Sequence, residues 1–211
     1  MKNVIRKSIS SVMAAVALSA CVLAPTTINS NDSKLNFVNA IEAEAAFSPY
    51  YGLLTQMNTS LKDSPNGRTI GTLRMYTPVY VTDSYYPWVK VSCSDGEGWI
   101  KSNNMLTISQ QEYYIREDFI AGKRTAFVTA RRGIDCRENP SMDSKVKGNV
   151  WFLSTAEVVS IWTAGRDGVV WAELADRSFL PLTNGKSYNQ VELLTKEEAA
   201  RMRRMYNFYR Y

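Results

Sequence analysis

The chain of 211 residues carries the same succession of turn clusters and short β-prone runs twice, and this repetition narrows the folds open to it. The first copy spans residues 58–106 and begins with a Pro/Asn/Gly turn at 63–67. Runs rich in Val, Tyr and Trp follow at 79–81 and 88–91, and a hairpin turn is expected at 95–98. Short apolar runs bounded by such turns predict a small antiparallel β structure.

The second copy spans residues 133–194 and keeps the order of the first. In this interpretation Gly148 corresponds to Gly71, and Cys136 stands where the first copy has Leu61. A chain of this length can bury two small cores as readily as one large core. We therefore predict an internal duplication, with one small domain for each copy.

Residues at corresponding points of both copies resemble the bacterial SH3 (SH3b) family. The pattern is a basic residue before a Pro turn, a later Gly, a Trp that opens a strand, and a Gly-Trp pair entering the last strand. The first copy has Lys62, Pro65, Gly71, Trp88 and Gly98-Trp99, and the second has Arg137, Pro140, Gly148, Trp171 and Ser178-Phe179. This resemblance implies a mainly β fold with two small SH3-like β-barrels.

Each expected barrel is followed by a short α-helix that begins with a capping box. Ser109 with Glu112, and Thr195 with Glu198, have the spacing in which a hydroxyl and a carboxylate satisfy each other's free backbone N–H groups. Gly122 is expected to end the first helix. The expected organisation is a signal peptide and spacer at 1–45, SH3b-like domains at 46–108 and 128–194, a helical linker at 109–127 and a C-terminal helix at 195–211.

The N-terminus has the pattern of a secretory signal, because a basic stretch at 2–7 precedes an apolar run at 9–24. Two processing sites compete. Cys21 ends a lipobox-like Leu-Ser-Ala-Cys run and would be lipidated, whereas 43–45 reads Ala-Glu-Ala and suits ordinary signal peptidase. The third alternative is an uncleaved anchor, for which the run is short. All three predict an exported protein, secreted or associated with the cell envelope.

The chain contains no histidine, which restricts the chemistry it can perform. Histidine is the usual general base near neutral pH and the commonest metal ligand. Catalytic pairs and triads that use it, and His-rich zinc sites, are therefore excluded. We expect a non-enzymatic protein with no cofactor and no metal. The remaining enzymatic alternative is a small hydrolase that uses carboxylates such as Asp63, Asp95 or Glu97.

Aromatic residues beside turns are the candidate ligand contacts, since small barrels bind extended peptides in aromatic grooves. Trp88 and Trp171 open strands with apolar neighbours, so packing is the favoured role for them. The candidates for ligand binding are Tyr85, Tyr86, Trp99, Trp162 and Arg166. The competing interpretation is that these loop side chains only cover the end of a barrel.

Two cysteines, Cys93 and Cys136, follow the signal segment. Cys93 is in phase with Val89 and Val91 by the period of two of a strand, and Cys136 replaces a leucine of the other copy. We expect each thiol to face a separate core, where the two cannot reach bonding distance.

The family resemblance implies peptidoglycan peptide as the ligand, and the net charge of +5 favours an anionic wall polymer. The main alternative is a structural subunit that binds another envelope protein. The segment 195–211 mixes basic and aromatic residues; we expect its apolar side to dock on the second barrel, with contact to an anionic membrane as the alternative. No nucleic acid partner is expected for an exported protein.

Overall fold

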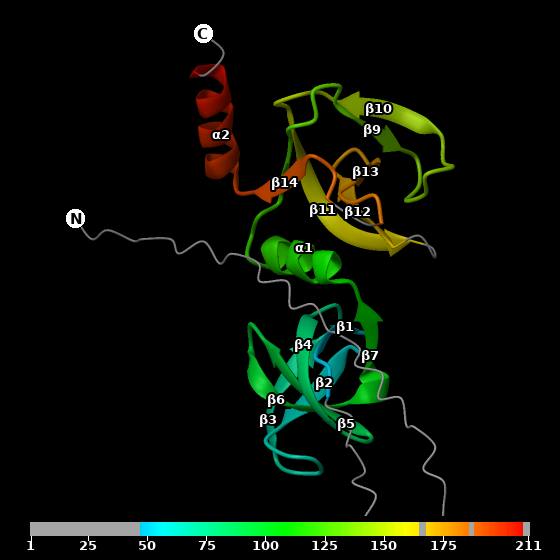
Figure 1. Cartoon of the computed structure of the whole chain (residues 1–211), viewed down its shortest axis with the longest axis vertical. Helices are drawn as coiled ribbons and strands as arrows, with labels where there is room; N and C mark the ends of the chain where they lie inside the picture. The colour runs from blue at the N-terminus through cyan, green and yellow to red at the C-terminus, as the bar shows by residue number, and fades with distance from the viewer. Residues whose placement is uncertain (1–46, 165–167, 186–187, 209–211) are drawn as a thin grey trace, which may run out of the picture. The chain divides into compact units, whose positions relative to one another are not determined.

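The computed structural model describes residues 47–164, 168–185 and 188–208, and its fold is mainly β with two short α-helices (Figure 1). The strands form two antiparallel sheets of seven strands each. The first sheet contains β1 (Tyr50–Leu54), β2 (Asn58–Lys62), β3 (Thr69–Arg74), β4 (Pro78–Tyr85), β5 (Trp88–Cys93), β6 (Gly96–Lys101) and β7 (Met105–Ile108). The second contains β8 (Thr125–Val128), β9 (Ile134–Arg137), β10 (Val146–Val150), β11 (Thr155–Ala164), β12 (Val169–Leu174), β13 (Phe179–Pro181) and β14 (Val191–Leu194).

The two sheets have the same strand order. The first reads β3-β2-β6-β5-β4-β1-β7 and the second β10-β9-β13-β12-β11-β8-β14, so each strand corresponds to the one seven places later. The register agrees as well: Leu61 lies opposite Gly71, and Cys136 lies opposite Gly148. The structural correspondence is therefore the one that the sequence predicts for these positions.

The two sheets also share an irregularity at the same point. The pairing of β4 with β5 shifts between Val81 and Asp83, and the pairing of β11 with β12 shifts between Val158 and Ser160. Each shift leaves one additional residue in the longer strand, as in a β-bulge. Strand β4 and strand β11 thus reverse the alternation of their side chains at equivalent places.

Each sheet buries its own set of apolar side chains. In the first sheet, Val89, Val91 and Ile100 alternate along β5 and β6 and join one core cluster. Cys136 belongs to the core cluster of the second sheet, and Cys93 packs at the side of the first cluster. Both thiols are free, and they face separate cores as predicted.

The structure differs from the expected boundaries at two places. The turn between β5 and β6 lies at Ser94 and Asp95, so Gly98 is inside strand β6 and not in the turn. Strand β8 begins at Thr125, within the segment 109–127 that we expected to be a linker. All four of its residues are buried, and a short continuous apolar run has no alternation by which to recognise a strand.

Helix α1 (Gln110–Ile120) packs on the second sheet, where Ile115 joins the core. Ser109 Oγ accepts a hydrogen bond from the Glu112 backbone N–H at 3.1 Å, which confirms the predicted N-cap. Gly122 follows the helix with φ of 89°, a conformation that favours glycine at this position.

Helix α2 (Lys196–Phe208) begins with the complete capping box. The Thr195 N–H donates to Glu198 Oε2 at 3.0 Å, and the Glu198 N–H donates to Thr195 Oγ1 at 3.2 Å. Ala199 packs against Phe127 of the second sheet, as expected for the apolar side of this helix. Arg203 is exposed, and its Nε donates a hydrogen bond to the Leu153 carbonyl at 3.0 Å.

No helix in the described ranges has both the length and the hydropathy needed to cross a bilayer. The expected signal segment, with Cys21 and the 43–45 site, lies outside these ranges.

Candidate functional site

The side of the first sheet that faces away from its core carries aromatic and basic side chains. Directly paired residues of an antiparallel sheet point to the same side, opposite to their neighbours along the strand. The pairings Lys62 with Trp99, Trp99 with Lys90, and Lys90 with Asp83 therefore form one row across four strands. A second row joins Tyr85, Trp88 and Lys101. We call these seven residues the first outer face.

Trp88 forms the base of the first outer face. The Trp88 side chain points to the side of the sheet opposite to Val89, yet only 4% of its surface is exposed. The ammonium groups of Lys62 and Lys101 each lie 5.9 Å from the centre of its ring, a distance typical of cation–π contacts. Trp88 is thus buried, as predicted, but beneath basic side chains and outside the main core cluster.

The second sheet has an equivalent surface. Its pairings give a row of Arg137, Phe179, Glu173 and Ser160, and a row of Trp162, Trp171 and Pro181. We call these seven residues the second outer face.

Direct contacts organise the second outer face. Trp162 Nε1 donates a hydrogen bond to Glu173 Oε2 at 2.9 Å. The rings of Trp162 and Phe179 lie edge to face with centroids 6.4 Å apart, a favourable aromatic geometry. These contacts hold two aromatic side chains around one carboxylate, while Trp171 is 1% exposed beneath them.

The two outer faces differ in charge at their centre. Lys90 and Glu173 occupy equivalent positions, because each pairs with the aromatic residue of the neighbouring strand. Lys90 forms an ion pair with Glu97, whose hydrogen bond and charge raise the pKa of the lysine. The basic residue at one end of each row, Lys62 or Arg137, is kept in both copies.

Most of the sequence-predicted ligand residues lie on these surfaces. Tyr85 and Trp99 belong to the first outer face and Trp162 to the second. Tyr86 is 91% exposed in the turn after β4, and Arg166 is outside the described residues. Sequence reasoning missed Glu173; counting in steps of two along the strand from Trp171 would have found it on the same side.

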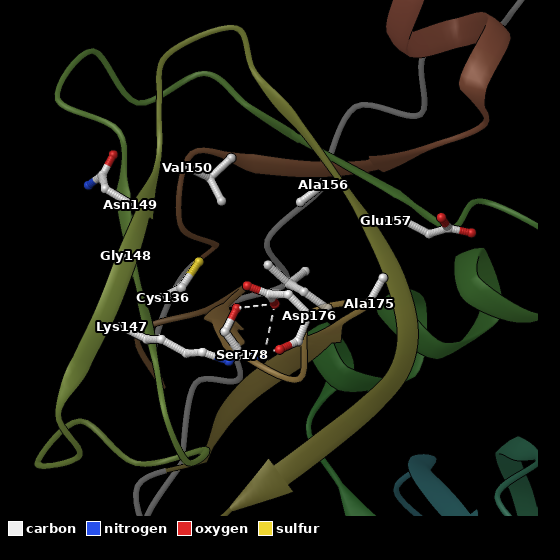
Figure 2. A pocket seen from close by; sticks show the side chains of 11 residues that line it. Cys136, Lys147, Gly148, Asn149, Val150, Ala156, Glu157, Ala175, Asp176 and Ser178 are labelled. Atoms are coloured by element: carbon white, nitrogen blue, oxygen red, sulfur yellow. Dashed lines mark hydrogen bonds between the residues drawn. The ribbon is translucent and has the colours of Figure 1, made fainter.

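A cavity of about 330 Å³ lies at another place on the second sheet, between β10, the start of β11 and the turn that joins β12 to β13 (Figure 2). Ser178 Oγ donates to Asp176 Oδ1 at 2.6 Å, and the Ser178 N–H donates to the same oxygen at 2.9 Å. Lys147 Nζ donates to the Asp176 backbone carbonyl at 2.8 Å. Cys136 lines the inner part of this cavity.

The environment of the cavity sets the protonation of its groups. The two hydrogen bonds from Ser178 lower the pKa of Asp176, so this carboxyl group is ionised at neutral pH. Burial raises the pKa of the Cys136 thiol, although its hydrogen bond with Ser178 acts in the opposite direction. Over residues 47–164, 168–185 and 188–208, no three Cys, Asp or Glu side chains gather closely enough to hold a metal ion.

No protein-family model and no curated protein matches the chain. Among solved structures, it is similar to NlpC2 and NlpC1 from Trichomonas vaginalis, at 12% and 13% identity and a TM-score of 0.28 for both. The matches cover 69% and 71% of this chain and 48% of each of those chains. An NlpC/P60 family protein from Bacillus cereus matches at 13% identity and a TM-score of 0.27, over 67% of this chain and 55% of that chain.

The chain thus spans about half the length of the structures it matches. These TM-scores are too low to establish a shared fold. We therefore infer the function from the geometry of the two outer faces and from the sequence.

Proposed function

We propose that each sheet is an SH3b-like barrel and that the protein is an exported, non-catalytic component of the cell envelope. In this proposal the two outer faces bind the peptide of peptidoglycan or an anionic wall polymer. The likeness to SH3b modules in the sequence pattern of both copies supports this assignment.

The observation that carries the proposal is the repetition of aromatic residues at equivalent register positions of the two outer faces. Tyr85 corresponds to Trp162, and their side chains are 66% and 48% exposed. Trp99 corresponds to Phe179, and each pairs with a basic residue of the neighbouring strand. Aromatic faces can stack on an extended peptide or a sugar, and Lys or Arg can pair with its carboxylates.

The state of the two cysteines supports a non-catalytic role. A cysteine nucleophile acts as the thiolate, which requires a lowered pKa. Burial instead raises the pKa of both Cys93 and Cys136, and the chain has no histidine to accept a proton from either thiol.

Co-sedimentation with purified insoluble peptidoglycan tests the proposed function. We expect the protein to pellet with the wall at low and moderate salt. Trp99→Ala and Trp162→Ala are expected to reduce the pelleted fraction because each removes an aromatic surface. Trp151→Ala is the matched control: this tryptophan is 67% exposed but lies in the connection between β10 and β11, outside both outer faces.

Two outcomes would overturn the proposal. The first is wild-type protein that stays in the supernatant at every salt concentration. The second is an equal loss of pelleting for Trp151→Ala and the two outer-face variants, which would indicate unspecific adhesion through exposed aromatic residues.

A further inference from the structure

The cavity near Cys136 exists because the second sheet has a smaller side chain than the first at this position. In the first sheet, a methyl group added to Gly71 would lie 3.9 Å from Leu61, so the leucine fills the adjoining space. In the second sheet, a methyl group added to the equivalent Gly148 would meet nothing within 4 Å. With Cys136 at the position equivalent to Leu61, the second sheet has room next to strand β10.

The second sheet also brings a hydroxyl group to the cavity, at a position where the first sheet has glycine. A Cβ atom on Gly98 of the first sheet would lie 2.8 Å from Leu61 Cγ and 2.6 Å from the Lys62 carbonyl oxygen, which excludes a side chain there. The equivalent residue of the second sheet is Ser178, with 1% of its surface exposed. The two copies thus differ at two equivalent positions that border the same space. Cys136 makes this space larger, and Ser178 adds a polar group to it.

The cavity has an apolar part and a charged part, as Figure 2 shows. Val150 and Ala156 line one part. Ser178, Asp176 and Lys147 lie together at the other. Glu157 also borders the cavity but its carboxylate points away from it.

The ionised Asp176 carboxylate is the group at this site with which a cation can pair. Asp176 is held ionised by Ser178, and Lys147 already uses one of its hydrogen atoms to bind the Asp176 backbone carbonyl. Asp176 and Lys147 are the charged residues whose polar groups face the cavity, whereas the Glu157 carboxylate at the rim points away from it. A volume of about 330 Å³ lies at the lower end of the range for small-molecule pockets.

We propose that this cavity binds a primary ammonium group that is attached to a short aliphatic body, such as the N-terminal residue of a peptide. The ammonium group pairs with the Asp176 carboxylate, and the aliphatic part contacts Val150, Ala156 and Cys136. This site is separate from the outer faces, so it does not depend on the proposed wall binding.

Titration of the isotope-labelled full-length protein with alaninamide tests the proposal, with amide chemical shifts as the readout. Alaninamide carries an ammonium group and a methyl group but no carboxylate. We expect it to shift the amide signals of Gly148 and Ser178. N-acetylalanine, which has a carboxylate and no ammonium group, is expected to leave these signals unchanged.

Two variants and one control locate the binding site. The double variant Cys136→Leu/Ser178→Gly copies the first sheet and is expected to abolish the shifts because leucine fills the cavity. Asp176→Asn keeps an oxygen for Ser178 but removes the charge, and should weaken binding by roughly tenfold, the loss expected for one charge-assisted hydrogen bond. Asp95→Asn, in the equivalent turn of the first sheet, is the matched control and should bind as the wild type does.

The proposal is overturned if alaninamide causes no shift at Gly148 and Ser178. It is also overturned if N-acetylalanine binds equally well, or if Asp95→Asn weakens binding as much as Asp176→Asn. Asp176→Asn keeps the test decisive should the double variant not fold, since it changes only one exposed side chain.

Discussion

Glu112 and Arg116 form a buried ion pair one helical turn apart within α1, in contact with strand β11. Arg116 Nε donates to Glu112 Oε1 at 2.8 Å, and Thr163 Oγ1 donates to the same carboxylate oxygen at 2.6 Å. Arg116 also donates to the Ile161 carbonyl at 3.4 Å. The two residues are 3% and 9% exposed, so the pair connects the helix to the second sheet in an environment with little water.

Arg116→Ala is expected to destabilise the protein because it leaves the Glu112 carboxylate buried without its partner. The expected loss in the free energy of unfolding is about 3 kcal/mol. Urea denaturation followed by circular dichroism measures it. Lys123→Ala is the control, since it breaks a more exposed pair, between Asp118 of the same helix and Lys123 just after it, and should cost less than about 1 kcal/mol. Equal losses for the two variants would contradict this role of the buried pair.

Gly98→Ser is expected to destabilise the first sheet, because its Cβ would lie too close to Leu61 and to the Lys62 carbonyl. Overpacking of this kind typically costs about 1–3 kcal/mol. Adding Leu61→Cys should recover part of the loss, since it recreates the pair Cys136 and Ser178 of the second sheet. A double-mutant cycle on the free energy of unfolding measures this coupling. Strictly additive effects of the two substitutions would contradict it.

Ala199→Glu is expected to detach helix α2 from the second sheet. Ala199 is 3% exposed and packs with Phe127 and Leu153, so a carboxylate placed there would lose its hydration. The expected loss in the free energy of unfolding is about 2–4 kcal/mol. Ala200→Glu, at the next position of the helix, is exposed and should change it by less than about 0.5 kcal/mol. A similar loss for both variants would show that the helix is not docked on this face.

Ser178→Ala is expected to raise the pKa of Asp176 towards its usual value, because the serine hydroxyl hydrogen bond is the largest cause of the lowered pKa. A carboxyl pKa that is lower in the folded state contributes stability above the unfolded pKa and loses it as the pH falls through the folded value. The variant should therefore lose less stability than the wild type on acidification. Carboxyl carbon chemical shifts measure the pKa directly, with Ser144→Ala as a control. An unchanged Asp176 titration in Ser178→Ala would contradict this cause.

The duplication could be predicted from the sequence because its signals are local. Pro and Gly turns bound the strands, and Leu61 and Cys136 can be matched by their distance from those turns. Strands β1 and β8 could not be predicted from the sequence in this way. The run Tyr50–Leu54 has no clear alternation, and all four residues Thr125–Val128 are buried, so period-of-two patterns do not mark either one.

The binding surfaces could be predicted only in part. The position of aromatic residues beside turns pointed to Tyr85, Trp99 and Trp162. The contact of Trp162 with Glu173 depends on the pairing of β11 with β12, which the sequence alone does not specify. The cavity at Cys136 likewise depends on side-chain packing. In the first copy Leu61 fills the space beside Gly71, whereas the smaller Cys136 leaves the equivalent space open in the second.

The irregular pairing in β4 and β11 explains how residues four apart can serve opposite surfaces. Val81 is fully buried and Tyr85 is 66% exposed, and the same contrast separates Val158, at 1%, from Trp162, at 48%. Strict alternation would have pointed both members of each pair inwards or both outwards. Because the unpaired residue absorbs this mismatch, shortening either strand by that one position would preserve which side chains meet solvent.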